Sequence, residues 1–163
     1  MIALYIGRFQ PLHKGHYEYI EKILNENPEL KIVIGSSQES NTKRNPFTAE
    51  ERKEMIRNCF PHVKIFTAND YPNENEKWLS NIKKTVGKFD IVYAGENQLI
   101  RSIFFKAGYK VKTIGRINNI SSTKIRNLIA KGKEWKHLVP ECAYRYIKKI
   151  NGEERIKNET TKS

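Results

Sequence analysis

Two histidines around a glycine are the residues of this sequence best suited to chemistry. His13 and His16 flank Gly15, shortly after the apolar run at residues 2–6, where we expect a strand to end and a helix to begin. The unpaired N–H groups of a first helical turn attract anions, and imidazole N–H groups can donate to phosphate oxygens. Gly7, at the end of the run, lets the backbone approach a ligand closely. The pattern therefore predicts a phosphate-binding turn.

This turn matches neither of the two common glycine-rich phosphate loops. Gly7 and Gly15 lie eight residues apart, and no Ser or Thr follows a Gly-Lys pair, so both the dinucleotide fingerprint and the P-loop are excluded. Arg8 and Lys14 add positive charge. The histidines have two alternative interpretations, a metal-binding pair and solvent-facing turn residues. The lack of a third nearby ligand disfavours zinc, and the number of anion-binding groups in one turn favours phosphate.

A second cluster, ISSTKIR, occupies residues 120–126. A hydroxyl at Ser121 or Ser122 can cap a helix that begins here, which leaves the other N–H groups of that turn for a phosphate. Arg126 lies one turn later on the face of Ser122, where its guanidinium could hold two phosphate oxygens. The alternative is an ordinary capped helix with basic residues on its surface.

Short apolar runs alternate with helical patterns through five cycles. Most runs are continuous, which is typical of strands covered on both faces. The alternation predicts an α/β fold, a Rossmann-like five-stranded parallel sheet with right-handed crossovers and helices on both faces. Ligands of such sheets bind beyond the carboxyl ends of the strands. The runs are Ile2–Ile6, Leu30–Ile34, Val63–Phe66, Phe89–Tyr93 and Tyr109–Ile114.

Apolar residues three or four positions apart predict the helices. Thr48 and Glu51 form a capping box at the start of one of them, and residues from Arg155 onward are expected to fray. The stripes of the earlier helices are Tyr17, Ile20, Ile23 and Leu24, then Trp78, Leu79, Ile82 and Val86, then Leu99, Ile103 and Phe104. The stripes of the C-terminal helices are Ile125, Leu128 and Ile129, then Trp135, Leu138, Val139, Cys142, Tyr146 and Ile150.

Composition and charge limit the possible functions. The 163 residues, 38% hydrophobic, predict one folded domain, and the net charge of +12 predicts an anionic partner. Residues 101–163 carry sixteen Lys and Arg against five Asp and Glu. No apolar run approaches the roughly 18 residues of a membrane span, so we expect a cytoplasmic protein. Cys59 and Cys142 have no CxxC partner, and we expect two half-buried thiols in a reducing cytoplasm.

Together the two clusters resemble the nucleotidyltransferases of the HxGH type, whose marks are His13-x-Gly15-His16 and the later ISSTxIR segment. Within that superfamily the chain is most similar to the archaeal-type nicotinamide-nucleotide adenylyltransferases. The resemblance implies a single HxGH nucleotidyltransferase domain over residues 1–163, with C-terminal helices, in a homo-oligomer that is often a hexamer. The other matching segments are Ile6–Pro11, Ile34–Gln38, Arg44–Arg52, Asn75–Trp78 and Ile150–Lys157.

The resemblance implies transfer of AMP from ATP to nicotinamide mononucleotide (NMN), which gives NAD and pyrophosphate without a covalent enzyme intermediate. Because both reactants are strongly negative, catalysis should consist mainly of alignment and electrostatic stabilisation. No cluster of Asp or Glu accompanies the motifs, so we expect no protein-held metal. Mg²⁺ would arrive on the ATP phosphates.

The same resemblance implies roles for individual residues. His13 and His16 would donate to oxygens around the α-phosphate, and Arg126 would hold the leaving β/γ end. The other ATP-binding residues would be Gly7, Arg8, Phe9, Gly15, Gly95, Ser121, Ser122 and Thr123. The residues that bind the acceptor mononucleotide would be Ser36, Arg44, Asp70, Asn75 and Trp78.

Alternatives remain for the acceptor residues and for the function as a whole. Trp78 begins an apolar helical stripe and could belong to the core, and Asn75 could be a helix cap. Motif spacing identifies the chemistry better than the acceptor, so phosphopantetheine, flavin or cytidylyl transfer stay open. A basic nucleic-acid-binding protein is a further alternative, with aromatic side chains as stacking platforms. Against it, these aromatics fall mostly on apolar helical stripes; they are Tyr109, Trp135, Tyr144 and Tyr146.

Overall fold

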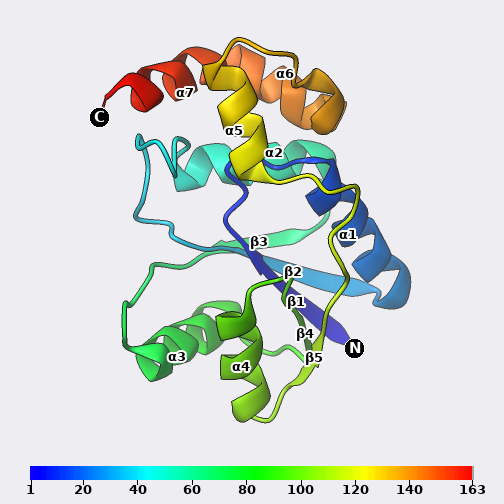
Figure 1. The fold of residues 1–163 in the computed structure, drawn as a ribbon. Helices are drawn as coiled ribbons and strands as arrows, with labels where there is room; N and C mark the ends of the chain where they lie inside the picture. The colour runs from blue at the N-terminus through cyan, green and yellow to red at the C-terminus, as the bar shows by residue number, and fades with distance from the viewer. Residues whose placement is uncertain (163) are drawn as a thin grey trace. The chain divides into compact units, whose positions relative to one another are not determined.

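The computed structural model describes residues 1–162, and they fall into two compact units (Figure 1). Unit one comprises Met1–Arg8, Tyr19–Gln38 and Val63–Arg116. Unit two comprises Phe9–Glu18, Glu39–His62 and the chain from Ile117 onward. The single domain expected from the sequence stays a prediction, and each unit is described by itself.

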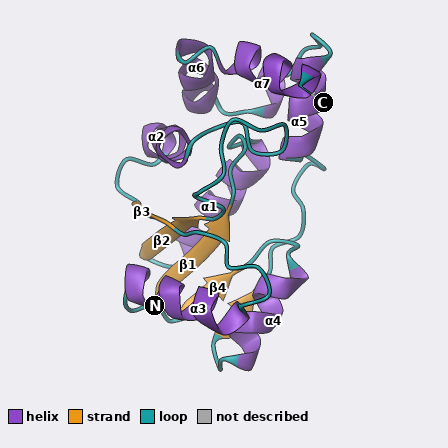
Figure 2. Ribbon diagram, turned by 90° about the vertical axis from the view of Figure 1, so that its left-hand side faces the viewer, coloured by secondary structure: helices purple, strands orange, loops and turns teal. Residues whose placement is uncertain are grey.

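Unit one contains a parallel sheet of five strands in the order β3-β2-β1-β4-β5. Figure 2 shows the strands in orange and labels β3, β2, β1 and β4. The five predicted strands and their parallel pairing are confirmed. The last two strands are shorter than predicted, because only three residues of each pair with the other. The strands are β1 (Ile2–Gly7), β2 (Glu29–Ile34), β3 (Lys64–Thr67), β4 (Ile91–Tyr93) and β5 (Lys110–Lys112).

Helices cover both faces of this sheet, as predicted (Figure 1). Side chains alternate along β1: Tyr5 stacks on Tyr19 of α1 with 4.8 Å between ring centroids, whereas Leu4 packs with Ile82 of α3 and Phe104 of α4. The three central strands β1, β2 and β4 are therefore buried on both faces, which explains their continuous apolar runs. The helices are α1 (Lys14–Glu26, in unit one from Tyr19 onward), α3 (Asn75–Val86) and α4 (Gln98–Lys106).

The strand order places two predicted ATP-binding glycines at neighbouring strand ends. β1 pairs with β2 on one side and with β4 on the other, in a register that sets Tyr5 opposite Tyr93. Gly7 ends β1, and Gly95 follows β4 by two residues. From β1 the chain adds β2 and β3 on one side, and then adds β4 and β5 on the other side. In such sheets ligands bind beyond the carboxyl ends of the two strands where the direction changes, here β1 and β4.

Unit two is built from helices. α6 contacts both α2 and α7, and α5 contacts α7. The predicted capping box of α2 is confirmed, because Thr48 and Glu51 exchange side-chain to backbone hydrogen bonds. The helices are α2 (Ala49–Cys59), α5 (Ser122–Ala130), the 3₁₀ turn η1 (Lys136–Leu138), α6 (Glu141–Lys149) and α7 (Gly152–Thr161).

The C-terminal region differs from the prediction in two places. The stripe from Trp135 to Ile150 is split into η1 and α6, because Pro140 disfavours helical backbone in the residue before it and precedes α6 as its N-cap. The frayed tail predicted from Arg155 is wrong for the described residues. α7 extends to Thr161 and buries Ile156, whose apolar contact stabilises the final helix.

The expectation of two free thiols is also wrong. Cys59, the last residue of α2, forms a disulfide with Cys142 in α6, with a Cα–Cα distance of 5.4 Å. The two residues are 83 positions apart, and their separation along the chain carries no information on their distance in space. Packing of α6 against α2 brings them within the range that a disulfide requires.

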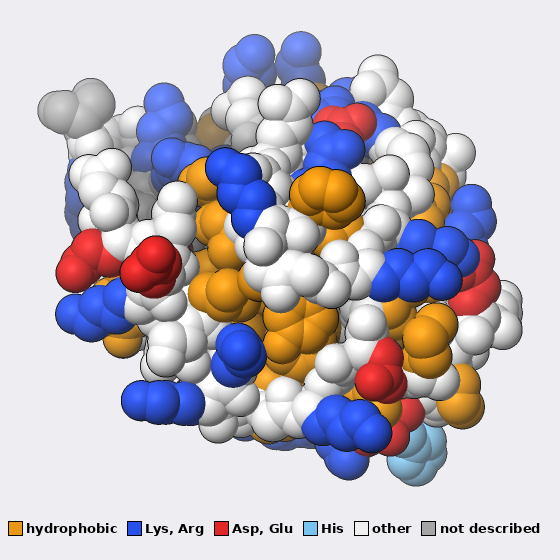
Figure 3. Space-filling view, turned by 90° about the horizontal axis from the view of Figure 1, so that it is seen from below, with side chains coloured by type: hydrophobic (Ala, Val, Ile, Leu, Met, Phe, Trp, Pro, Cys, Tyr) orange, Lys and Arg blue, Asp and Glu red, His pale blue; other side chains and the backbone are white. Residues whose placement is uncertain are grey.

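Hydrophobic side chains gather among Lys and Arg side chains on the surface viewed from the side of α3 and α4 (Figure 3). Leu99 and Phe105 of α4 are 58% and 74% exposed. Among residues 1–162, no helix has both the length and the apolar character that crossing a membrane requires.

Candidate phosphate-binding site

The two histidines cap the first turn of α1 reciprocally. The backbone N–H of His16 donates to Nδ1 of His13 at 3.2 Å, and the backbone N–H of His13 donates to Nδ1 of His16 at 3.1 Å. This is the arrangement of a capping box, with two imidazoles in place of the usual Ser or Thr and Glu. The rings stack with 3.6 Å between their centroids. The spacing of three residues is thus explained by helix geometry.

The capping bonds determine which ring nitrogen carries the proton. A backbone N–H can donate to Nδ1 only when that nitrogen has no hydrogen, so each neutral ring carries its proton on Nε2. Burial, together with the neighbouring His13 ring, holds the pKa of His16 well below its usual value. His16 is therefore neutral at pH 7. Each ring therefore has an Nε2–H group near a helix start, a position that suits an anionic ligand.

Gly15 lies directly against one of these rings. A Cβ at this position would lie 2.8 Å from Cε1 and 2.9 Å from Nδ1 of His13, closer than real Cβ contacts. Any larger residue would therefore displace the His13 ring from its capping position. The contact with the His13 ring explains why this position of the motif requires glycine. The contact of Gly15 with a phosphate stays a prediction.

Phe9 supports the histidines from the preceding loop. Its side chain is buried, and its ring centroid lies 4.8 Å from that of His16. The backbone of Phe9 has a φ of +54°, which is uncommon for a residue other than glycine and recurs at functional sites. The peptide bond between Gln10 and Pro11 is cis. We infer that Phe9 helps to fix the orientation of the His16 ring.

The second sequence cluster contacts this same loop. Ser121 is the N-cap of α5, since its hydroxyl accepts from the N–H of Lys124 at 3.1 Å. Ser122 donates its hydroxyl to the carbonyl of Pro11 at 2.9 Å. The two motifs, more than a hundred residues apart in sequence, therefore converge within unit two.

Arg126 has a role that the sequence did not indicate. Its side chain is buried, and its Nη1 donates to the carbonyl of Gln10 at 2.8 Å while Nη2 donates to the Thr123 hydroxyl at 3.3 Å. The guanidinium therefore anchors the histidine loop on α5. Its contact with the β- and γ-phosphates stays a prediction.

Gln10 is the main residue that the sequence analysis missed. It is buried, its Nε2 donates to the carbonyl of Phe47 at 3.0 Å, and its Oε1 accepts from the N–H of Phe47 at 2.9 Å. This pair of bonds joins the histidine loop to the segment before α2. A polar residue between the apolar Phe9 and Pro11, inside the matching segment Ile6–Pro11, was the signal available in the sequence.

The predicted acceptor residues of unit one belong to the loops that follow the strands. Ser36, just after β2, has a φ of +49°. Asp70, after β3, is exposed and exchanges two hydrogen bonds with Gln38, each of 3.0 Å. These bonds tie the loops after β2 and β3 together. The roles of Ser36 and Asp70 in acceptor binding stay predictions.

Trp78 and Asn75 lie on α3. The Trp78 ring is half-buried and meets Phe104 edge to face, with 5.8 Å between centroids, so this side chain does contribute to the core of unit one. Asn75 is the exposed first residue of α3 and is not its cap, because Glu74 holds that position without a side-chain bond. Their contacts with the nicotinamide ring and amide stay predictions.

Arg44, the remaining acceptor candidate, lies in unit two. It is exposed on a turn in which the N–H of Thr42 donates to the carbonyl of Asn45 at 3.2 Å, and the N–H of Asn45 donates to the Thr42 hydroxyl at 2.9 Å. A guanidinium presented on an ordered turn is suited to binding a phosphate. In the described part of the chain, no three His, Cys, Asp or Glu residues are grouped so as to hold a metal ion.

Comparison with known proteins extends these observations. Residues 4–128 match the profile of the cytidylyltransferase-like family. The nicotinamide-nucleotide adenylyltransferase of Thermoplasma volcanium is 39% identical over 98% of this chain and 92% of its own length. The enzyme of the same name from Saccharolobus solfataricus is 43% identical over 95% of this chain and 94% of its own.

Solved structures share the fold. A bifunctional NMN adenylyltransferase/ADP ribose pyrophosphatase from Francisella tularensis, complexed with AMP and a manganese ion, has a TM-score of 0.79 at 24% identity over 97% of this chain. Thermotoga maritima TmcAL bound to α-thio ATP has a TM-score of 0.72 at 12% identity over 94% of this chain. This chain covers 51% of the first structure and 56% of the second.

Proposed function

The chain belongs to the nicotinamide-nucleotide adenylyltransferases, within the cytidylyltransferase-like family, and we propose that it transfers AMP from ATP to NMN. The products are NAD and pyrophosphate. The observation that carries the proposal is the contact between the histidine loop and α5, which brings both nucleotidyltransferase motifs together in unit two.

The reaction needs positioned donors and no protein nucleophile. An oxygen of the NMN phosphate attacks the α-phosphorus of ATP, and the bond between the α-phosphorus and the oxygen bridging to the β-phosphate breaks. Pyrophosphate leaves with the electron pair of that bond. Negative charge grows on the α-phosphoryl oxygens and on the leaving group, and fixed N–H donors lower its energy.

The histidine pair supplies such donors. The Nε2–H groups of His13 and His16 point away from their capping bonds, and we assign them to oxygens around the α-phosphate. Their orientation is fixed before the substrate binds, so little reorganisation opposes the reaction.

The start of α5 is assigned to the leaving group. The first-turn N–H groups at Ser122 and Thr123 carry the partial positive charge of a helix N-terminus, and Arg126 adds a full charge in the next turn. Arg8 would bind a further ATP phosphate and Arg44 the phosphate of NMN. Mg²⁺ is expected to enter with ATP as part of the substrate.

Acceptor recognition is proposed for the residues of unit one that resemble the family. Trp78 would stack on the nicotinamide ring, and Asn75 and the backbone near Asp70 would read its amide. The test is release of pyrophosphate from MgATP with a panel of acceptors: NMN, its acid form, phosphopantetheine and flavin mononucleotide, with CTP in place of ATP as a further arm. NAD formation from ATP and NMN supports the proposal. Turnover only with another acceptor or with CTP would contradict it.

The nucleic-acid alternative has less support. Tyr109 stacks on Phe89 with 4.6 Å between centroids, and Trp135 is buried with its indole N–H donating to Glu153. Trp135 therefore belongs to the interior, and Phe89 covers one face of the half-buried Tyr109 ring. A titration with an oligonucleotide at two salt concentrations tests the alternative, and we expect weak binding. Tight binding with a steep salt dependence, unaffected by ATP, would favour the alternative.

We also expect a homo-oligomer in the cytoplasm, often a hexamer in this family. Support comes from the exposed apolar side chains Leu99 and Phe105 on α4, since exposed apolar surface favours association. Light scattering coupled to size exclusion measures the assembly directly, and a monomer would contradict this part of the proposal.

A further inference from the structure

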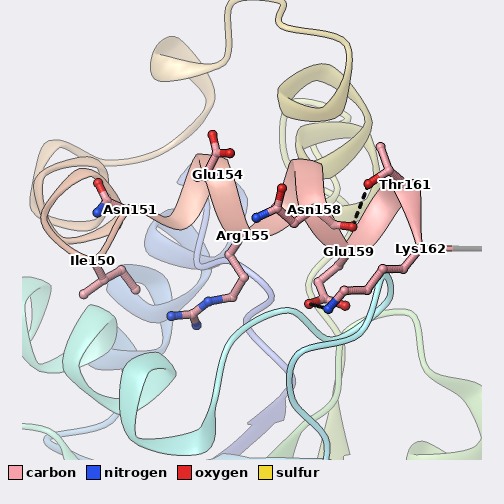
Figure 4. Close-up of a pocket in the computed structure, with 8 residues that line it drawn as sticks. All are labelled: Ile150, Asn151, Glu154, Arg155, Asn158, Glu159, Thr161 and Lys162. Carbon is pink, nitrogen blue, oxygen red and sulfur yellow. Dashed lines mark hydrogen bonds and ion pairs between the residues drawn. The ribbon is translucent and has the colours of Figure 1, made fainter.

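The C-terminal helix carries sequence similarity that the phosphate chemistry does not explain. The segment Ile150–Lys157 is part of the resemblance to the family, yet none of its residues has a role in the reaction described above. In α7, Arg155 points away from Glu154 and toward α2 and the loop before it (Figure 4). The contacts of Arg155 suggest what this segment does.

The Arg155 guanidinium contacts three residues around the start of α2. It forms an ion pair with Glu51, its Nη1 donates to the carbonyl of Pro46 at 3.5 Å, and it lies over the ring of Phe47 with 5.8 Å to the centroid. The side chains of Arg155 and Glu51 are 25% and 15% exposed. Because this pair is largely removed from water, it restrains geometry more strongly than a surface ion pair does.

The carbonyl of Pro46 also closes the turn that carries Arg44. It accepts a hydrogen bond from the backbone N–H of Asn41 at 3.2 Å, in addition to the bond from Arg155. The chain from Asn41 to Pro46 is therefore a closed loop, and Arg155 holds the oxygen at which it closes. Arg44 lies inside this loop.

Glu51 connects Arg155 to the beginning of α2. Its carboxylate accepts from the N–H of Thr48 at 2.9 Å, as part of the capping box. Burial raises the pKa of Glu51, but hydrogen bonds from Arg155 and Thr48 outweigh that effect and leave the pKa below its usual value. Glu51 is therefore ionised at neutral pH, and it joins α7 to the N-terminus of α2.

Phe47 is held from a second direction. Gln10 bonds both backbone groups of Phe47, while a Cβ on Gly152 would lie 3.0 Å from its ring and 2.7 Å from the side chain of Ile147. Only glycine lets the start of α7 pack this close to the ring. The segment from Pro46 to Glu51 thus has one anchor on the histidine loop and another on α7.

We propose that Arg155 is a positioning residue for the acceptor: from α7 it holds the loop Asn41–Pro46 so that Arg44 is presented to the NMN phosphate. The proposal rests on the proposed function, which assigns that phosphate to Arg44. It concerns the acceptor because Arg155 contacts the Arg44 segment directly, whereas it reaches the histidine loop only through Phe47, and Arg126 and Ser122 anchor that loop on α5.

The kinetic test compares Arg155→Ala and Arg155→Lys with the control Arg145→Ala. Arg145 is a matched control, since it also pairs with a glutamate, Glu141 on α6, but its side chain is 78% exposed. For Arg155→Ala we expect the KM for NMN to rise about tenfold, while kcat and the KM for ATP change less than about threefold, the pattern of lost ground-state binding. Arg155→Lys should lie between wild type and Arg155→Ala, and Arg145→Ala should match wild type.

Hydrogen exchange of the substrate-free protein provides a readout that needs no activity. Arg155→Ala should accelerate backbone exchange at residues 41–48 at least about tenfold, with the first turn of α1 unchanged and with no such change in Arg145→Ala. Unchanged exchange at 41–48, or equal acceleration throughout unit two, would overturn the positioning role. If Arg155→Ala does not fold, Arg155→Lys is held to the same criterion. If Arg155→Ala shows faster exchange confined to residues 41–48 but the wild-type protein does not turn over NMN, then Arg155 does position the loop and it is the proposed function that is wrong.

Discussion

The residues assigned to ATP in unit two and those assigned to the acceptor in unit one are held in different ways. His13 and His16 cap one another, and the loop before them is bonded to α5 and to Phe47. Asp70 and Asn75, in contrast, are exposed. Groups that stabilise charge in a transition state act best when they are fixed in advance. The exposed acceptor residues of unit one can instead gain their contacts when the acceptor binds.

The largest effect is expected from removing one fixed donor while keeping its capping bond. In His16→Asn, Oδ1 takes the place of Nδ1 and can still accept from the N–H of His13, but no N–H reaches the position of Nε2. Turnover should fall about 100-fold or more, the usual scale for one such donor, with little change in melting temperature.

His16→Gln is the matched variant, because its amide N–H reaches farther and should retain more turnover than His16→Asn. Pyrophosphate release at saturating ATP and NMN measures both. Wild-type turnover in His16→Asn would remove His16 from the reaction and erase the contrast between the two regions.

A second substitution disturbs the fixed region through its geometry alone. The added methyl of Gly15→Ala would displace the His13 ring and break the capping bond that it accepts. We expect turnover to fall at least about tenfold and stability to fall by about 1 kcal/mol, the usual cost of a lost cap. Gly115→Ala is the control, since a Cβ added at Gly115 would have no neighbouring atom within 4 Å. Steady-state rates and urea denaturation test both variants, and equal behaviour of the two would contradict the steric account.

The acceptor region should respond in KM and not in turnover. Trp78→Ala removes the proposed stacking partner of the nicotinamide ring and should raise the KM for NMN about three- to tenfold, the range for one aromatic contact. Trp78→Phe keeps a ring against Phe104 and should restore most of the affinity. Melting temperatures separate binding from folding. A lower melting temperature with an unchanged KM would show that Trp78 serves only the core.

The smallest expected effect is on stability as a function of pH. The pKa of His16 in the folded protein lies well below its usual value, so the unfolded chain takes up a proton first as the solution is acidified. The contribution of His16 to stability is therefore greatest above about pH 6.5, the ordinary value, and is lost as the pH falls toward the lowered pKa. Urea midpoints between pH 7.5 and pH 5 should decline less in His16→Gln than in wild type. An equal decline in His16→Gln and in wild type would contradict this effect of His16.

Local sequence patterns correctly predicted the structural features that are determined by residues close together in the sequence. The five strands, the capping box of α2 and the turn at His13 all follow from residues within a few positions of one another. The bonds of Gln10 to Phe47 and of Arg126 to Gln10 span 37 and 116 positions, so no local pattern encodes them.

Two wrong predictions have the same origin. Arg155 and the residues after it are mostly polar and read as a tail, because the contacts of α7 with Phe47 and Glu51 are distant in sequence. The disulfide between Cys59 and Cys142 likewise depends on the packing of α6 against α2. Neither the polar composition of the C-terminal segment nor the spacing of the two cysteines carries information on these tertiary contacts.

Imidazole nitrogen chemical shifts of His13 and His16, measured by NMR without ligand and with a non-hydrolysable ATP analogue and Mg²⁺, test the histidine pair most directly. We expect both rings in the Nε2–H form in the free protein, and shifts concentrated at the two Nε2 atoms when the nucleotide binds. Protons on Nδ1 in the free protein, or a bound nucleotide that leaves both Nε2 atoms unchanged, would contradict the account.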